Sequence, residues 1–205
     1  MKKIVLSLII IASISNSYSQ TYKLSKKIGT SGNEGWDYLA VDDVAQHLFV
    51  SHGNMVNIID LKSDKTIAII PDTKGVHGIA IANDVNKAFI SNGKDNSITV
   101  VNLKTFELLE KVKIAGIKPD AILYDQFSRK VFVYNAESND ATVLDAVTNK
   151  VVKTIPLGGK PEFSVTNNKG LIYVNIEDKN EIKTINASIL EVTSTWSITP
   201  GDEPS

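Results

Sequence analysis

The sequence contains no cysteine. This absence excludes disulfide bridges, cysteine-ligated metal sites, thiol catalysis and attachment of a lipid to an N-terminal cysteine. Histidine is also scarce, and the three histidines, at positions 47, 52 and 77, do not have the spacing of zinc ligands. The chain also has no G-x-S-x-G elbow, phosphate-binding glycine loop or dinucleotide fingerprint. These absences remove the common catalytic motifs from consideration.

The sequence lacks an excess of charge of either sign, with a formal net charge of −1. Affinity for nucleic acid depends largely on positive charge that neutralises phosphates. We therefore predict no nucleic-acid partner, although the net charge leaves open a local basic groove for a single strand. Hydrophobic residues make up 42% and charged residues 22% of the chain, which is typical of a globular domain with a sizeable core.

Long hydrophobic runs are absent beyond the N-terminus. There, Lys2 and Lys3 precede an apolar run over residues 4–14, which is followed by small polar residues that end at Ser19. This pattern predicts a signal peptide over residues 1–19, and cleavage would leave Gln20 as the first residue. The run is shorter than the roughly 20 residues needed to cross a bilayer, so we expect no membrane span. The expected location is periplasmic or secreted, with residues 20–205 as the mature domain.

No segment repeats its apolar residues with the 3.6-residue period of a helix, so we expect very little helix. Short apolar runs instead recur with a period of about 42 residues. One run in each repeat contains an aromatic residue, at Phe49, Phe89, Phe132 and Tyr173. A polar residue closes another run, at Asp60, Asn102, Asp145 and Asn186. This period predicts an all-β propeller with four blades of four antiparallel strands.

Turn residues between the apolar runs set the expected limits of strands a to d in each repeat. The predicted strands are 38–41, 47–51, 56–60 and 66–70; 79–82, 87–91, 98–102 and 108–114; 121–124, 130–134, 142–145 and 151–155; and 163–166, 171–175, 182–185 and 192–198. Alternating apolar and polar residues predict a further strand over 21–28. We expect all four repeated aromatic residues to fill the gaps between blades.

A Gly-x-x-Pro tetrad joins strand d to the next strand a at 116–119, 158–161 and 201–204. Together with the repeated V-F/Y-V-x-N core, which is clearest within 130–150, the tetrad resembles the YVTN-type repeat of YncE-like propellers. The resemblance covers everything after about residue 30. It implies an exported bacterial propeller with seven blades, and it supplies no catalytic motif. Trp36 and His77 depart from the proline of the pattern.

The phase of the repeat predicts that the chain is the N-terminal fragment of a longer propeller. Residues 201–205 repeat the lead-in to a strand a, and residues 21–28 have the phase of a strand d. In a closed ring, such a strand completes the last blade. We therefore expect part of a seven-bladed propeller, with a complete four-bladed propeller as the alternative.

The d-to-a and b-to-c loops share one rim of a propeller, so polar side chains in these loops can meet. Asp37, Asp120 and Glu162 occupy one repeat position beside the central channel, and Trp36 and His77 precede that position in their own repeats. We predict that these five residues bind a ligand, which would be an unknown protein, glycan or small molecule. The alternative is that they only solvate the mouth of the channel.

The three carboxylates would also suit a hard cation such as calcium, because calcium prefers oxygen ligands. No acidic loop with calcium-binding spacing occurs, however, and acids in loops are usually solvated. The prediction therefore includes no metal, no cofactor and no catalytic residue. The expected function is a noncatalytic binding scaffold of the bacterial cell envelope. The alternative is a calcium-dependent hydrolase of the lactonase kind, which rests on analogy of fold.

Overall fold

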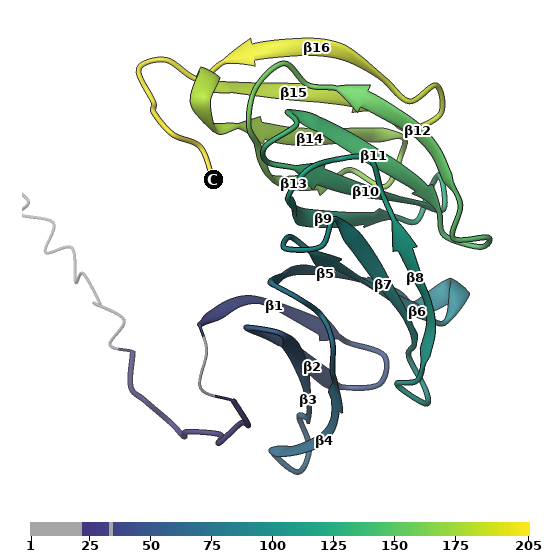
Figure 1. The fold of residues 1–205 in the computed structure, drawn as a ribbon. Helices are drawn as coiled ribbons and strands as arrows, with labels where there is room; N and C mark the ends of the chain where they lie inside the picture. The colour runs from purple at the N-terminus through teal and green to yellow at the C-terminus, as the bar shows by residue number, and fades with distance from the viewer. Residues whose placement is uncertain (1–21, 33–34) are drawn as a thin grey trace, which may run out of the picture.

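The computed structural model describes residues 22–32 and 35–205, which form four separate sheets, each with four antiparallel strands (Figure 1). We call these sheets blades 1 to 4. Their strands are β1 (Trp36–Asp42), β2 (His47–His52), β3 (Met55–Asp60) and β4 (Lys65–Ile70); β5 (Val76–Ala82), β6 (Lys87–Asn92), β7 (Ser97–Asn102) and β8 (Leu108–Lys113); β9 (Pro119–Asp125), β10 (Lys130–Asn135), β11 (Asp140–Asp145) and β12 (Val151–Pro156); and β13 (Pro161–Thr166), β14 (Leu171–Ile176), β15 (Glu181–Asn186) and β16 (Glu191–Ser197). The predicted all-β propeller fold is confirmed, with strand limits close to those expected.

Helical structure in the described residues consists of two single turns of 3₁₀ helix, η1 (Asn83–Val85) and η2 (Glu177–Lys179). This agrees with the lack of a helical apolar period. No helix in the described ranges has the length and apolar character that crossing a membrane would require.

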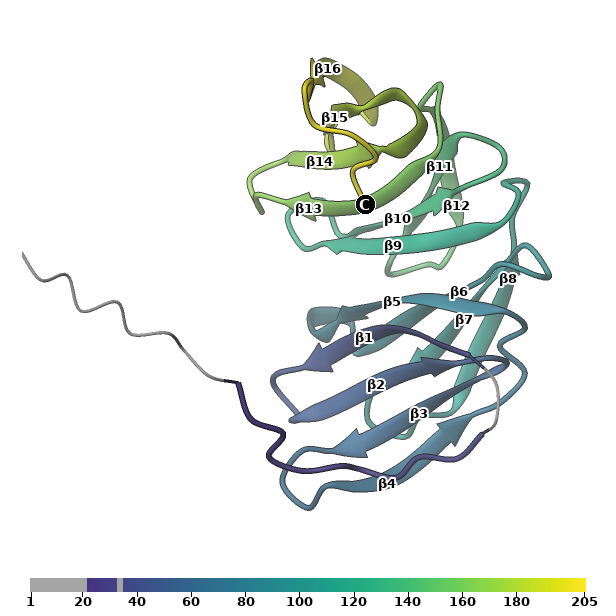
Figure 2. The same cartoon turned by 90° about the vertical axis from the view of Figure 1, so that its left-hand side faces the viewer.

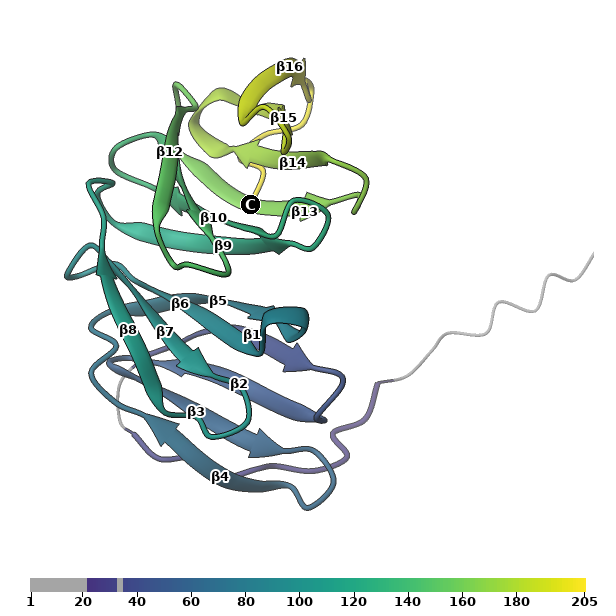
Figure 3. The same ribbon diagram turned by 90° about the vertical axis from the view of Figure 1, so that its right-hand side faces the viewer.

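The four blades follow one another along an arc, with the first strand of each blade on the inner side. Strands β1, β5, β9 and β13 contact one another in that order, and the d strands lie on the outside of the arc (Figures 1 and 3). Phe49 lies in a buried cluster between blades 1 and 2, Phe89 in one between blades 2 and 3, and Phe132 in one between blades 3 and 4. All three side chains are fully buried, so their predicted role between blades is confirmed.

The prediction that Tyr173 is also buried between blades is wrong. Tyr173 is half-buried, and its ring contacts Trp196 with a centroid separation of 5.8 Å. It occupies the same repeat position as Phe132, but no described blade packs against that face of blade 4. The face also leaves Phe163 and Val165 exposed. Burial of the repeated aromatic residue therefore depends on the neighbouring blade as well as on the residue's place in its own strand.

The predicted strand over 21–28 is also not observed, because residues 22–28 form no strand and residue 21 lies outside the described residues. The segment runs past blade 1 beside β4 (Figure 2). Its carbonyl at Ser31 accepts hydrogen bonds from His52 Nδ1 (2.8 Å) and Asn57 Nδ2 (3.3 Å), and Lys26 pairs with Asp64 (2.5 Å). Single contacts of this kind hold the segment against the blade without the backbone hydrogen-bond ladder that defines a strand.

The a-to-b and c-to-d turns lie at one end of the blades, which we call the turn rim. In every c-to-d turn, the side chain of the residue that ends strand c accepts hydrogen bonds from the backbone N–H groups two and three residues later. These residues are Asp60, Asn102, Asp145 and Asn186. The repeat keeps an Asp or Asn there because its side-chain oxygen closes the turn.

Candidate functional site

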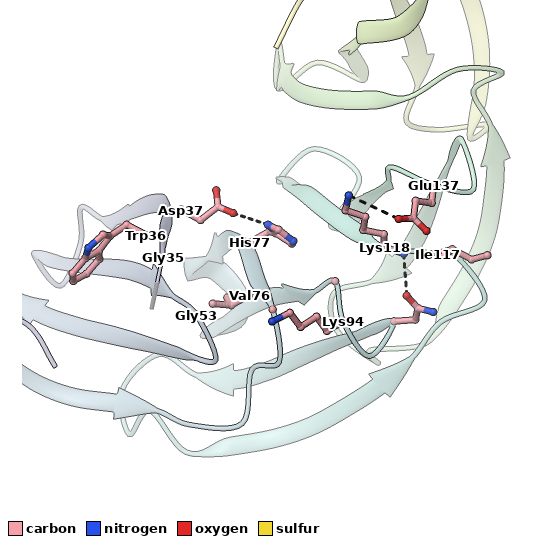
Figure 4. Close-up of a pocket in the computed structure, with 13 residues that line it drawn as sticks. Gly35, Trp36, Asp37, Gly53, Val76, His77, Lys94, Ile117, Lys118 and Glu137 are labelled. Atoms are coloured by element: carbon pink, nitrogen blue, oxygen red, sulfur yellow. Dashed lines mark hydrogen bonds and ion pairs between the residues drawn. The ribbon is translucent and has the colours of Figure 1, made fainter. Parts of the chain in front are cut away.

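The d-to-a and b-to-c loops lie at the other end of the blades, which we call the loop rim. There the structure contains a pocket of about 870 Å³, drawn in Figure 4, which we call the loop-rim pocket. It is lined by Gly35, Trp36, Asp37, Gly53, Gly75, Val76, His77, Gly93, Lys94, Asn96, Ile117, Lys118 and Glu137. These residues come from equivalent loops of blades 1, 2 and 3. Trp36, Asp37 and His77 of the predicted site line the pocket, whereas Asp120 and Glu162 do not.

His77 lies between two of the predicted carboxylates. Its Nδ1 is 2.5 Å from Asp37 Oδ2 and 3.8 Å from Asp120 Oδ1. The backbone carbonyl of His77 accepts a hydrogen bond from Ser51 Oγ of the preceding blade. Because this bond and the hydrogen bond to Asp37 hold both ends of the residue, the ring is fixed with Nδ1 towards the acids. The prediction that these side chains meet across blades is therefore confirmed for Asp37, His77 and Asp120.

Asp120 is the most enclosed member of this group, with 17% of its side chain exposed. Its backbone carbonyl accepts a hydrogen bond from Ser91 Oγ, in the position that Ser51 has in blade 1. Burial raises the pKa of the Asp120 carboxyl, and the nearby His77 opposes that rise. The carboxylate is thus held in an unfavourable environment that its closeness to His77 partly offsets.

The hollow of the pocket results from glycine at one repeat position. Gly53 and Gly93 follow strand b in blades 1 and 2, where blades 3 and 4 have Ala136 and Glu177. A Cβ on Gly93 would lie 2.8 Å from His77 Nε2, which is too close for two non-bonded atoms. Gly93 therefore allows the His77 ring to lie against the backbone of its loop.

Trp36 lines the edge of the pocket but contacts a different residue. Its indole stacks on the His52 ring, with centroids 3.8 Å apart and an angle of 18° between the planes. Figure 4 shows the indole on the far side of Asp37, directed away from His77. The structure therefore does not bring Trp36 together with the His77 group.

Glu162 also belongs to a separate group. It pairs with Lys160 (2.8 Å), and Lys160 pairs in turn with Glu177. These two carboxylates raise the pKa of the Lys160 ammonium. Glu162 therefore pairs with a lysine of its own loop, whereas Asp37 and Asp120 lie beside His77. No cluster of three or more His, Asp or Glu side chains suited to holding a metal ion occurs among residues 22–32 and 35–205.

With this geometry established, the chain can be compared with known proteins. A family model described as a YNCE-like beta-propeller matches residues 8–170. The chain belongs to the YncE-like β-propeller family. The "Uncharacterized protein YncE" of Salmonella typhi is 28% identical over 168 residues, which cover 78% of this chain and 47% of that protein. Its counterpart from Salmonella typhimurium is 27% identical over 168 residues, which again cover 78% of this chain and 47% of that protein. The chain thus spans about half the length of the curated relatives it matches.

Solved structures with this fold are remote in sequence. Hydrazine synthase of Kuenenia stuttgartiensis superimposes with a TM-score of 0.74 at 15% identity, over 86% of this chain and 53% of that one. A protein from Desulfotomaculum acetoxidans, described as functionally unknown, gives a TM-score of 0.71 at 16% identity, over 82% and 58% of the two chains. At such identities the likeness shows the propeller fold alone.

Sequence reasoning missed one member of the site of this YncE-like propeller. Tyr38 was assigned only to a strand, but it packs against the core between blades 3 and 4. Burial raises the pKa of Tyr38 to about 12, and the charges of Asp120, Glu162 and Asp37 add to the effect. The one available signal was a tyrosine at the position that Ile79, Ala121 and Phe163 occupy in the other repeats. Lys94, Lys118 and Glu137 also line the pocket, and sequence reasoning did not select them as site residues.

Proposed function

We propose that this YncE-like propeller is an exported, noncatalytic scaffold of the bacterial cell envelope that binds a ligand in the loop-rim pocket. The observation that carries the proposal is the arrangement of His77. Its Nδ1 is engaged by Asp37, and its ring lines a cavity formed by loops of three successive blades. Cavities between about 300 and 1,000 Å³ that combine a few fixed polar groups with apolar walls are typical of small-ligand sites.

Export is proposed from residues 1–19, which lie outside the described residues. The short apolar run behind Lys2 and Lys3, followed by Ser17 and Ser19, supports a cleaved signal peptide. Mass spectrometry of the exported protein should give a mature chain that begins at Gln20. A mass that retains the leader, or recovery in the membrane pellet after a salt wash, would contradict export.

Binding without turnover is proposed because the pocket offers fixed hydrogen-bonding groups, and the serines that contact its loops are not directed at the His77 ring. The hydroxyl groups of Ser51 and Ser91 donate hydrogen bonds to the backbone carbonyls of His77 and Asp120. A serine nucleophile needs its hydroxyl directed to the ring of a base. In the described part of the chain, these serines instead hold the loops in place.

The test combines His77→Ala with Asp120→Asn in the full-length protein. Lys104→Gln serves as the matched control, because Lys104 lies in a c-to-d turn of the turn rim. A library of sugars, organic acids and peptides is screened by thermal shift, with the fold of each variant checked by circular dichroism. The double variant should lose the stabilisation that its ligands give the wild type, and the control should keep it. Unchanged stabilisation in the double variant would reject the site, and turnover of a library member that the double variant abolishes would reject the noncatalytic proposal.

A further inference from the structure

Among the described residues, Lys94 is a lining cation that has no ion-pair partner. Its ammonium has no carboxylate within ion-pair distance in the part of the chain that the structure describes, whereas Lys118 lies 3.9 Å from Glu137. Lys94 is exposed, and its stem lies over Gly75, where a Cβ would be 2.6 Å from Lys94 Cγ. The backbone of the neighbouring loop thus directs this cation over the floor of the pocket.

His77 supplies the second available group. Among the described residues its Nε2 makes no hydrogen bond, because both of its polar contacts use Nδ1. The proton on Nδ1 is donated to Asp37, so Nε2 can accept a hydrogen bond from a hydroxyl group when the ring is neutral. Figure 4 shows Lys94 and His77 on the blade 2 side of the pocket, with Lys118 and Glu137 across from them.

The lining also contains acceptors, which restrict the chemistry of a ligand. The carboxylates of Asp37 and Glu137 line the same cavity as Lys94. A neutral sugar would provide no charge to pair with Lys94, and an apolar acid would provide no hydroxyl group for His77 Nε2 or for the remaining acceptor positions of the two carboxylates. A ligand that carries several negative charges would be repelled by the two carboxylates. The best match is a ligand with one carboxylate and several hydroxyl groups.

Resting on the binding function proposed above, we propose that the loop-rim pocket recognises a sugar acid, either a free uronic acid or the uronic acid unit of a glycan. The sugar carboxylate pairs with Lys94, one hydroxyl group donates to His77 Nε2, and further hydroxyl groups donate to Asp37 or Glu137. Gly53, Gly75 and Gly93 line the cavity without adding side chains to it. A volume of about 870 Å³ exceeds one hexose ring, so an oligosaccharide with a uronic acid unit also fits.

The experiment measures thermal stability of the full chain with matched probes at concentrations up to ~10 mM, which detects even weak binding. D-Glucuronate and D-galacturonate are compared with D-glucuronamide, which keeps the size and the hydroxyl groups but removes the charge, and with D-glucose. We expect at least one uronate to raise the melting temperature and to bind about tenfold more tightly than the amide. Lys94→Gln should abolish this preference, whereas Lys94→Arg and the turn-rim variant Lys104→Gln should retain it.

The outcomes separate this inference from the function on which it rests. Equal stabilisation by the uronate and the amide, a preference that survives Lys94→Gln, or no stabilisation by either uronate would overturn the sugar-acid proposal. If the wider library still yields a ligand that depends on His77 and Asp120, the binding function stands and only the ligand class is wrong. If no such ligand is found either, both proposals fall.

Discussion

At the turn rim, the residues that end strand c are Asp60, Asn102, Asp145 and Asn186, and in all four blades the side chain accepts hydrogen bonds from two backbone N–H groups. At the loop rim, one repeat position at the start of strand a holds Trp36, His77, Pro119 and Pro161. Trp36 stacks on His52, whereas His77 contacts carboxylates. The hydrogen bonds within the turn explain why every repeat keeps Asp or Asn at the end of strand c. They do not explain why Trp36 and His77 replace the proline of the repeat.

His77 at the loop rim and Asp145 at the turn rim also differ in the residues that surround them. His77 contacts carboxylates from blades 1 and 3, so its position depends on three blades at once. The Asp145 side chain, by contrast, accepts hydrogen bonds within its own turn, from the backbone N–H groups of Val147 and Thr148 and from the Thr148 hydroxyl. Residues with such local contacts stabilise one turn each, whereas groups joined across blades can form a site. The comparison therefore supports a structural role for the turn-closing residues and is the basis for the recognition proposed at the loop rim.

The largest expected effect comes from breaking the core that both rims share. Phe132→Ala removes a fully buried side chain between blades 3 and 4 and should cost about 3–5 kcal/mol of unfolding free energy. Denaturant unfolding with the wild type as reference measures this loss. A cost below about 1 kcal/mol would contradict the burial of this residue between two blades.

Gly93→Ala tests the loop rim without touching the core. The added methyl group would lie 2.8 Å from His77 Nε2, so the ring must leave its place beside Asp37. We expect a cost of about 1–2 kcal/mol in stability and loss of ligand binding. Thermal unfolding and the ligand screen measure both effects. The double variant Gly93→Ala/His77→Ala should regain part of the stability, and no such recovery would mean that the ring is not what the methyl group displaces.

Asp145→Ala tests the turn rim. Hydrogen bonds from the Thr148 and Val147 backbone hold the pKa of the Asp145 carboxyl below its usual value of 3.8. The ionised folded form is therefore favoured, and its stabilisation is present above pH 3.8 and lost as the pH falls through the lowered pKa. We expect the variant to lose about 0.5–1 kcal/mol at pH 7, because water competes for this partly exposed group. The difference from the wild type should disappear in acid, and ligand binding should not change.

Asp120→Asn should change stability least among these variants, and it should stabilise the folded state rather than destabilise it. Burial raises the pKa of Asp120 above 3.8, so the folded state holds its proton more tightly than the unfolded state. Stability from this group therefore falls as the pH rises through the raised pKa, and the neutral amide escapes that loss. The variant should melt slightly higher than the wild type at pH 7 and equally below pH 3.8. A lower melting temperature at pH 7 would show that the interaction with His77 outweighs burial.

The sequence predicted the blades well because each strand and turn is determined within its own repeat. Alternating apolar residues and turn residues located all sixteen strands from β1 to β16. The errors concern contacts between repeats or beyond them. The burial of Tyr173 needs a neighbouring blade, and the segment over 22–28 lies against blade 1 through single contacts. The period carries no information on either contact.

The candidate site was predicted in part for the same reason. A shared repeat position correctly brought Asp37 and Asp120 to one place, and the loop order placed His77 between them. Repeat position did not reveal that Trp36 stacks on His52 or that Lys160 neutralises Glu162. Those pairings depend on side-chain rotamers and on single substitutions within one loop. The glycines that hollow the pocket were visible in the sequence, but their effect required the positions of the side chains above them.

The most direct test of recognition at the loop rim is a titration of the ¹⁵N-labelled protein with D-glucuronate, followed by the chemical shifts of its backbone amides. We predict that the largest changes occur at Gly75, Val76, Gly93 and Lys94 and that the amides of the turn rim, such as Thr105 and Thr148, do not move. Changes concentrated at the turn rim, spread evenly over both rims, or absent at ~10 mM glucuronate would contradict recognition of this ligand at the loop rim.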